Sequence, residues 1–319
     1  MLAVLAGLHA PLAEVEAIMA RTLASEETRI AELITRLGSF HGKLLRPSLA
    51  LLVAEAAGTV SERHLRLGAA LELIHTATLI HDDLIDDADV RRGRPTAHTR
   101  FGNTTSVLLG DYFYTHAFDL VAQLDEPVLM RLLTRTTNVI CSGELHQQMA
   151  ARDITLTEEE YNRIIHAKTA VLCEVAGAFG AVDATRPQRA AAREYGRLCG
   201  MAFQVADDCL DFSGDSEKVG KTLTTDIERG RMTLPIIRAL AASHGSEREQ
   251  LERRLAEACS AADVATVRAL VTKAGGVASA LDTARRYTGE AQAQLAAFPE
   301  GEGRQKLHEL AEFIVSRDF

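Results

Sequence analysis

The stretch that decides the fold and points to the chemistry is residues 79–95, which read LIHDDLIDDADVRRGRP. Upstream of it, apolar residues recur at helical spacing, so we expect one long helix over residues 62–87 that leads into the acidic cluster. On such a helix Asp82 and Asp86 lie one turn apart on the same face, with Asp83 beside them. The sequence therefore predicts three carboxylates that converge on one point.

A cluster of carboxylates needs a counter-charge, because like charges a few Å apart repel and raise one another's pKa. Mg²⁺ prefers carboxylate oxygens and fills its remaining positions with water and substrate phosphates. Arg91, Arg92 and Arg94 follow the acids directly, and guanidinium groups bind phosphate oxygens in a bidentate manner. A single DDxxD pattern is nevertheless more often a solvated helix end than a metal site, so one copy leaves both interpretations open.

The chain contains a second copy of the pattern. Residues 203–215 read FQVADDCLDFSGD, and Asp207, Asp208 and Asp211 repeat the same spacing on another segment with helical apolar periodicity. Two such triplets on two helices that face each other across a cavity describe a site that holds a substrate diphosphate through several Mg²⁺ ions. Chance is a poor explanation for two copies.

These motifs resemble the trans-prenyltransferases, the head-to-tail polyprenyl diphosphate synthases. The resemblance runs from about residue 38 to the C-terminus and rests on the ordered motifs HGKLLRP, IHTATLIHDDLIDDADVRRGRPT, GELHQQ, HAKTA, FQVADDCLD and VGK. It implies an all-α fold, a single large helical bundle around a central cavity. We accordingly expect one polyprenyl synthase domain over residues 1–319, in which residues 1–37 form N-terminal helices without a chemical motif.

Composition agrees with a helical enzyme of this kind. Hydrophobic residues make up 47% of the 319 residues, Trp is absent and prolines are only seven, which suits helices better than sheet. The net charge of −9 argues against a nucleic-acid partner. Five widely spaced cysteines without a CxxC pair indicate neither a disulfide framework nor a zinc site, so we expect a cytoplasmic protein. No stretch reaches the ~18 apolar residues of a transmembrane helix, which leaves at most a peripheral membrane contact for product release.

The resemblance also assigns substrate ligands, residue by residue. The residues that match ligands of isopentenyl diphosphate, the extending substrate, are Lys43, Arg46, His75 and Arg92. The residues that match ligands of the allylic diphosphate are Arg91, Lys168 and Lys221, and Gln204 is a further substrate-binding position. Taken alone, a Lys-x-x-Arg pair is usually a solvated face, and His41 stands where the family commonly has glycine.

Several other residues carry more local predictions. His81 is expected to have a structural role, whereas Glu144 and Gln147 are expected to line the cavity. Thr157 and the glutamates after it have the pattern of a helix N-terminus, where the helix dipole favours acids. The polar, glycine-punctuated loop over residues 213–231 is expected to act as a lid that excludes water.

The reaction implied by the resemblance needs no protein nucleophile. The allylic diphosphate is bridged by Mg²⁺ between the two aspartate triplets, and Lys168 and Lys221 help to stabilise the departing diphosphate. The double bond of isopentenyl diphosphate then attacks the allylic cation, and loss of a proton, with the released diphosphate as the expected base, lengthens the product by one five-carbon unit.

Product length is predicted from the helix before Asp82. An isoprene unit is about as long as one helical turn, ~5.4 Å, so a bulky residue on this face would act as a floor. In the family, aromatic residues four or five positions before the first aspartate mark short-chain enzymes. Here these positions are Thr78 and Ala77, which predicts an open tunnel and a medium- or long-chain product of C30 or longer. Substitution of Ala77 by Phe is expected to shorten the product.

Other interpretations differ in definite features. A farnesyl or geranylgeranyl diphosphate synthase would have its floor elsewhere in the bundle. A terpene cyclase shares the helical fold, but its second metal motif usually mixes other residues. A non-catalytic partner subunit of a heteromeric synthase tends to lose the acids, and all six are present here. A Ca²⁺-binding acidic bundle would leave the Arg and Lys residues unexplained. The resemblance finally implies a homodimer.

Overall fold

A computed structural model of the protein describes residues 6–38, 44–91, 93–212, 225–256 and 261–316. The chain divides into two compact units, each built from discontinuous segments. The first unit comprises residues 1–136, 172–196 and 295–309, and the second comprises residues 137–171, 197–294 and 310–319.

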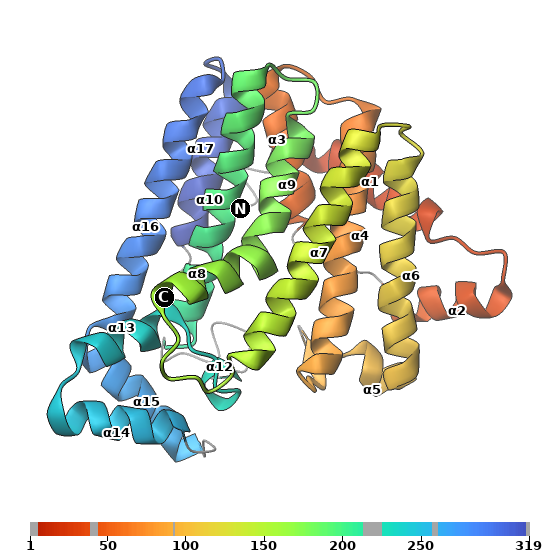
Figure 1. The fold of residues 1–319 in the computed structure, drawn as a ribbon. Coiled ribbons are helices and arrows are strands. Elements are labelled where there is room, and N and C mark those ends of the chain that lie inside the picture. Colours follow the sequence, from red (N-terminus) through yellow and green to blue (C-terminus); the bar gives the residue numbers. More distant parts are fainter. Residues whose placement is uncertain (1–5, 39–43, 92, 213–224, 257–260, 317–319) are drawn as a thin grey trace. The chain divides into compact units, whose positions relative to one another are not determined.

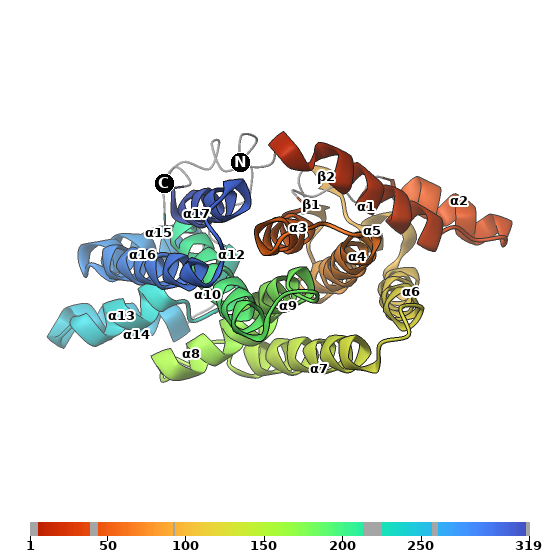
Figure 2. The ribbon, with the colours of Figure 1, turned by 90° about the horizontal axis from the view of Figure 1, so that it is seen from above.

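The first unit holds the N-terminal helices (Figure 1) and a small hairpin, whose strands are labelled in Figure 2. Its complete elements are η1 (Ala6–Leu8), α1 (His9–Thr22), α2 (Thr28–Leu37), α3 (Leu45–Ala57), α4 (Glu62–Ile85), the antiparallel strands β1 (Val90–Arg91) and β2 (Arg94–Pro95), α5 (Ala97–Phe101), α6 (Asn103–Ala122) and the 3-10 turn η3 (Leu295–Ala297). It also contains most of α9 (Val171–Gly180) and the first parts of α7 (Pro127–Met149), α10 (Arg186–Leu210) and α17 (Glu302–Val315).

Helix α4 is the central helix of the first unit. It packs against α1, α3 and α6, and Figure 2 shows α3 and α6 on opposite sides of it. Its buried residues run without a break from Leu67 to Ile74 and therefore lie all round the helix, as expected of a core helix. A capping box between Ser61 and His64 starts the helix. The first DDxxD motif therefore stands at the end of the central helix of this unit.

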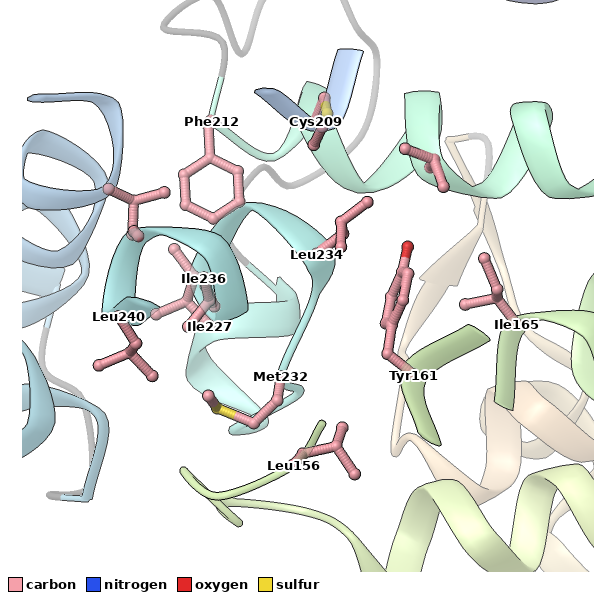
Figure 3. Close-up of a cluster of buried hydrophobic side chains, with 14 of the residues drawn as sticks. Leu156, Tyr161, Ile165, Cys209, Phe212, Ile227, Met232, Leu234, Ile236 and Leu240 are labelled. Carbon is pink, nitrogen blue, oxygen red and sulfur yellow. The ribbon is translucent and has the colours of Figure 1, made fainter. Parts of the chain in front are cut away.

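The second unit contains the helices that surround the second motif. Its complete elements are α8 (Glu158–Ile165), a π-helical turn (His166–Ala170), α12 (Thr225–Glu228), α13 (Leu234–Ala242), α14 (Gly245–Ala256), α15 (Ala261–Lys273) and α16 (Gly276–Gln294). The ends of α7, α10 and α17 complete it. In its core, Met201, Val205 and Cys209 recur every fourth residue along α10 and pack with residues of α8, α12 and α13 (Figure 3).

The prediction of an all-α fold is confirmed. The predicted helix over residues 62–87 ends two residues early, because Asp86 already acts as the C-cap and Asp87 adopts a left-handed conformation with φ 50°. Helices α7, α10 and α17 each run through both units, so the chain passes repeatedly between them. The single-domain organisation stays a prediction.

Within the described part of the chain, no single helix is both long and apolar enough to cross a bilayer. One bent pair, Asp263–Lys273 with Gly276–Ala297, meets the criteria of length and composition only when its two helices are taken together.

Candidate active site

The first aspartate cluster lies where α4 ends. The three carboxylates differ in exposure: Asp82 and Asp86 are partly exposed, whereas Asp83 is only 6% exposed. Successive residues on a helix point about 100° apart, so Asp83 cannot share the direction of Asp82. Asp83 therefore turns toward the interior, and the convergence of Asp82 and Asp86, one turn apart on the partly exposed side, stays a prediction.

The buried carboxylate of Asp83 is paired with an arginine of the following hairpin. Arg91 on β1 donates from Nε to Oδ1 of Asp83 over 2.6 Å. Burial raises the pKa of Asp83, and the positive charge of Arg91 opposes this increase. The pair ties the hairpin to the end of α4, so it places Arg91, a predicted ligand of the allylic diphosphate, beside the cluster.

His81 has the contacts of a structural residue, as predicted. Its Nε2 donates to the carbonyl oxygen of Val107 on α6 over 3.0 Å and lies 3.7 Å from a carboxylate oxygen of Asp111. Gly110 makes this possible, because a Cβ atom at that position would overlap the imidazole ring. The residue before Asp82 thus locks α4 against α6.

The predicted ligands of isopentenyl diphosphate are only partly described. Arg46, on the first turn of α3, is partly buried, and its Nε makes no hydrogen bond to the part of the chain that the structure describes. His75 is partly buried on α4. Lys43 and Arg92 lie outside the described residues. Arg46 and His75 both belong to the first unit, as does the first aspartate cluster.

The second aspartate cluster lies at the end of α10. Asp208 is only 3% exposed, and both of its carboxylate oxygens accept hydrogen bonds. The hydroxyl of Tyr161 donates to Oδ2 over 2.6 Å, and Nε2 of Gln204 donates to Oδ1 over 2.7 Å. Burial raises the pKa of Asp208 well above its ordinary value, and so does the nearby carboxylate of Asp226. Asp207, by contrast, is partly exposed.

A polar network continues from the second cluster. Asp211 accepts from the backbone N–H of Asp226 over 3.3 Å, and Asp226 forms an ion pair of 2.8 Å with Arg231. Arg231 also donates from Nε to the side-chain oxygen of Gln147 over 2.9 Å, with the amide oriented to accept. Gln147 thus belongs to this network. Lys221 and the larger part of the predicted lid lie outside the described residues.

Lys168 lies in the π-helical turn that follows α8. Such turns occur frequently at functional sites. The Lys168 amine lies 2.6 Å from Oε2 of Glu144 on α7, and the next residue, Thr169, donates to Oε1 of Gln204 over 2.7 Å. A chain of hydrogen bonds therefore links this turn through Gln204 to Asp208.

In the described part of the chain, neither aspartate cluster forms a metal site from protein side chains alone. Among the residues that the structure describes, no three His, Cys, Asp or Glu side chains come close enough together to hold a metal ion. An apolar pocket of about 590 Å³ lies between α1 and α2, and its lining includes Met19, Leu23 and Ile34 but none of the predicted site residues. We therefore base the site on the aspartate motifs and not on the pocket.

Sequence reasoning missed the residues that hold the motifs in place. These residues are Tyr161, Thr169, Asp226 and Arg231. Tyr161 and Asp226 have no signal of their own, because only the fold brings their partners near. Thr169 could have been noticed beside Lys168 in HAKTA. Arg231 could have been noticed as a cation close to the second motif.

Taken together, these features define a class of protein: an all-α chain with two DDxxD motifs, each at the end of a long helix. A sequence model of the family described as Polyprenyl synthetase matches residues 27–273 of this chain. The octaprenyl diphosphate synthase of Escherichia coli (strain K12) is 36% identical over 311 residues, which cover 96% of this chain and 96% of that protein.

Solved structures give the same result. A polyprenyl synthase from Caulobacter crescentus CB15, complexed with calcium and isoprenyl diphosphate, has a TM-score of 0.92 and 38% identity. A decaprenyl diphosphate synthase from Rhodobacter capsulatus has a TM-score of 0.92 and 36% identity. Each comparison covers 98% of this chain and 97% of the other. The chain belongs to the polyprenyl synthetase family, which confirms the resemblance inferred from its motifs.

Proposed function

We propose that the protein condenses isopentenyl diphosphate with an allylic diphosphate, in a Mg²⁺-dependent reaction, to a trans-polyprenyl diphosphate of C30 or longer. The observation that carries this proposal is the pair of complete DDxxD motifs, each at the end of a long helix. Membership of the family supports the reaction class. The names of the octaprenyl and decaprenyl diphosphate synthases support the long product.

The donor set fits magnesium. Mg²⁺ is bound through few carboxylates, with water and substrate phosphates in its other positions, so a group of three protein ligands is not required. The partly exposed carboxylates are those of Asp82, Asp86 and Asp207, which would hold the ions. Asp83 and Asp208 are buried and accept hydrogen bonds from protein groups, so we assign them the role of positioning residues. The calcium in the Caulobacter crescentus structure supports a divalent-cation site in that relative.

The cations of the chain would bind the two diphosphates. We propose Lys43, Arg46, His75 and Arg92 for isopentenyl diphosphate, and Arg91, Lys168, Lys221 and Gln204 for the allylic substrate. Nε of Arg46 supports the first group, because it has no acceptor among the described residues and a buried donor without a partner costs free energy unless a ligand accepts its hydrogen bond. Arg91 can reach a phosphate with its terminal nitrogens, since Nε is the atom that binds Asp83.

The proposed catalysis depends on stabilising the negative charge of the departing diphosphate. As the allylic C–O bond breaks, negative charge builds on the departing diphosphate, and Arg91, Lys168 and Lys221 stabilise it more strongly than in the ground state. Bound Mg²⁺ supplies further neutralisation of this charge. Arg46 and its partners hold isopentenyl diphosphate with its double bond toward the allylic cation. The new C–C bond forms, and the released diphosphate accepts the proton that is lost.

The product length is proposed from the α4 residues before Asp82. Thr78 is partly buried, whereas Ala77 is fully buried, and neither side chain is large enough to form a floor. The main alternative is a farnesyl or geranylgeranyl diphosphate synthase with a floor formed by residues of other helices. A non-catalytic partner subunit is the second alternative, and the complete motifs argue against it.

The first experiment is to incubate the purified protein with labelled isopentenyl diphosphate, Mg²⁺ and, separately, C5, C10, C15 and C20 allylic primers. Products of C30 or longer support the proposal. Products that stop at C15 or C20 identify a short-chain synthase, and no product from any primer favours the partner-subunit alternative. Removal of Mg²⁺ by a chelator is expected to abolish turnover.

Two neighbouring aspartates provide a matched pair of variants. Asp86→Asn removes a proposed metal ligand, and we expect activity to fall about 100-fold or more, as for the loss of other charge-stabilising groups. Asp87→Asn is the control, because the Asp87 side chain is 99% exposed and asparagine tolerates its left-handed backbone. Equal losses in both variants would count against a specific role for Asp86.

We further propose a homodimer, a single domain and a cytoplasmic location. Large apolar side chains are exposed on α6, at Val107 and Leu108, which supports association of two copies. The repeated passage of the chain between its two units supports one domain. Sedimentation analysis tests the dimer, and limited proteolysis with unfolding curves tests the domain.

A further inference from the structure

Glu144 on α7 holds the amine of Lys168. The two side chains form an ion pair of 2.6 Å, and only 22% of the lysine side chain and 15% of the glutamate side chain are exposed. Oε1 of Glu144 accepts a second hydrogen bond from Gln148, one turn further along α7, over 3.2 Å. Both oxygens of Glu144 are therefore fixed, and the position of the lysine amine is fixed with them.

The backbone brings this pair together by a close approach of α7 to the π-helical turn. A Cβ atom at Gly143 would lie 2.5 Å from the Cβ of Ala167 and 3.2 Å from the backbone nitrogen of Lys168. Only glycine permits this approach, and it places the next residue, Glu144, beside the lysine. On the other side of Lys168, Thr169 is bound to Gln204. The turn is thus held at both residues that flank Lys168.

A fixed lysine differs from a freely rotating one in its use for catalysis. The lysine stem has four rotatable carbons and loses much conformational freedom when its amine is immobilised. If the protein has already fixed the amine, binding of a diphosphate does not have to do so again. The ammonium group has three N–H donors, so it can keep Glu144 and still donate to a phosphate oxygen.

We propose that Glu144 is a positioning residue that acts on the allylic diphosphate through Lys168. This inference rests on the proposed function, in which Lys168 is a ligand of that diphosphate. Loss of Glu144 should then weaken the use of the allylic substrate and leave that of isopentenyl diphosphate unchanged. The role differs from lining a cavity, because it requires Lys168 to be present.

The test is a double-mutant cycle with Glu144→Ala, Lys168→Ala and the double variant. We expect Glu144→Ala to lower kcat/KM for the allylic diphosphate by about tenfold, with KM for isopentenyl diphosphate unchanged. In the Lys168→Ala background, the same change should have no further effect. Glu144→Gln keeps an oxygen that accepts from the amine, so it should restore a large part of the loss.

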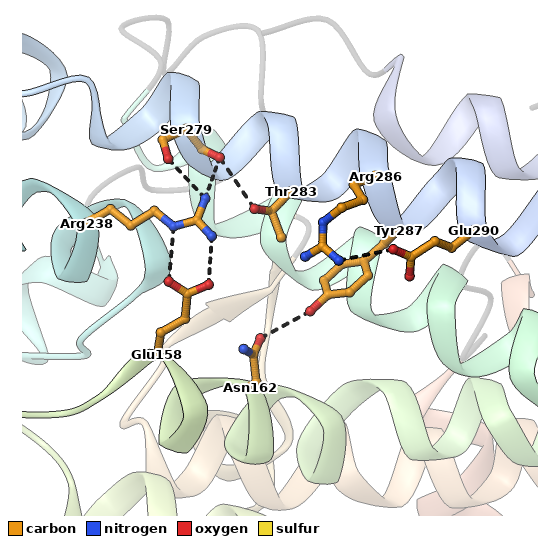
Figure 4. Close-up of polar contacts among 8 residues, drawn as sticks. All are labelled: Glu158, Asn162, Arg238, Ser279, Thr283, Arg286, Tyr287 and Glu290. Atoms are coloured by element: carbon orange, nitrogen blue, oxygen red, sulfur yellow. Dashed lines mark hydrogen bonds and ion pairs between the residues drawn. The ribbon is translucent and has the colours of Figure 1, made fainter.

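The matched control is Glu158→Ala. Glu158 is also a partly buried glutamate of the second unit, and it forms a bidentate pair with Arg238, with a shorter contact of 2.7 Å (Figure 4). We expect this variant to lower the thermal midpoint without changing the KM for either substrate. If Glu144→Ala shifts only the thermal midpoint, as the control does, or if its effect persists without Lys168, the inference is wrong.

A binding measurement separates this inference from the proposed function. Calorimetric titration with inorganic diphosphate and Mg²⁺ reports the Lys168 contact without turnover, and Glu144→Ala should weaken the affinity by about tenfold. If wild-type protein binds diphosphate but converts no primer, the proposed function fails and the titration still decides the role of Glu144. If wild-type protein is active and the titration is unchanged by the substitution, the role of Glu144 fails alone.

Discussion

The substitution Tyr161→Phe isolates one buried contact of the second aspartate motif. Tyr161 is 3% exposed, and its hydroxyl donates to a carboxylate that is equally buried, that of Asp208, over 2.6 Å (Figure 3 shows the hydroxyl pointing toward α10). Phenylalanine keeps the ring, so no cavity of the size of a side chain is created. What is lost is a hydrogen bond to a charged group, and the carboxylate oxygen is left buried with one donor fewer.

Hydrogen bonds to charged groups contribute about 1.5–3 kcal/mol, and an abandoned buried acceptor adds to this cost. We therefore expect the free energy of unfolding to fall by about 2–3 kcal/mol. Urea denaturation followed by circular dichroism measures the change. Because Asp208 loses a group that orients it, we also expect kcat to fall at saturating Mg²⁺.

A second, partly buried tyrosine provides the control. Tyr287 donates to the side-chain oxygen of Asn162 over 3.4 Å, which is a longer bond to a neutral group (Figure 4). Tyr287→Phe should therefore lower the free energy of unfolding by less than about 1 kcal/mol and leave kcat unchanged. If the two substitutions have the same effect on stability, the account of Asp208 as a buried carboxylate held by Tyr161 is refuted.

Two further predictions concern α4. Thr78→Phe, one turn before Asp82, is expected to shorten the product, as read by chromatography, and an unchanged product profile would contradict the floor argument. Ala77→Phe should shorten it too, but should also lower stability by about 1–3 kcal/mol, because Ala77 is fully buried. Burial lowers the pKa of His64, so the unfolded chain binds more protons below pH ~6.5 and stability should fall as the pH decreases through this value. His64→Gln keeps a capping-box residue opposite Ser61. We expect the thermal midpoint of this variant to change much less than that of the wild type between pH 7.5 and 5.5. If the midpoints of both proteins change equally with pH, His64 is not the origin of the dependence.

Local rules explain what the sequence could predict about the fold. Thr157 was expected at a helix N-terminus, and it is the N-cap of α8, where it exchanges hydrogen bonds with Glu160. The helices that carry both DDxxD motifs were likewise placed from apolar periodicity. These features depend on residues three or four apart, which a sequence displays directly.

The contacts that hold the candidate site depend on distant residues, so the sequence could not supply them. Tyr161 and Asp208 are 47 positions apart, and their pairing follows only when α8 packs against α10. Periodicity also treats Lys168 as an ordinary helical residue. The structure shows a π-helical turn there, which changes the direction of its side chain relative to an α-helix.

The two DDxxD motifs show why identical sequence patterns need different surroundings. In each, helix geometry turns the second aspartate away from the first, so Asp83 and Asp208 enter the interior and need donors from the protein. Asp83 receives a cation, Arg91, which opposes the effect of burial on its pKa. Among the described residues, Asp208 accepts hydrogen bonds from the neutral groups of Tyr161 and Gln204, and burial raises its pKa well above its ordinary value. The first motif is thus held by a charge that the hairpin brings, and the second by hydrogen bonds from the buried Tyr161 and the partly buried Gln204. Substitution of the partner of the first motif should consequently remove an interaction between charges, and substitution of the partners of the second should remove hydrogen bonds to a buried carboxylate.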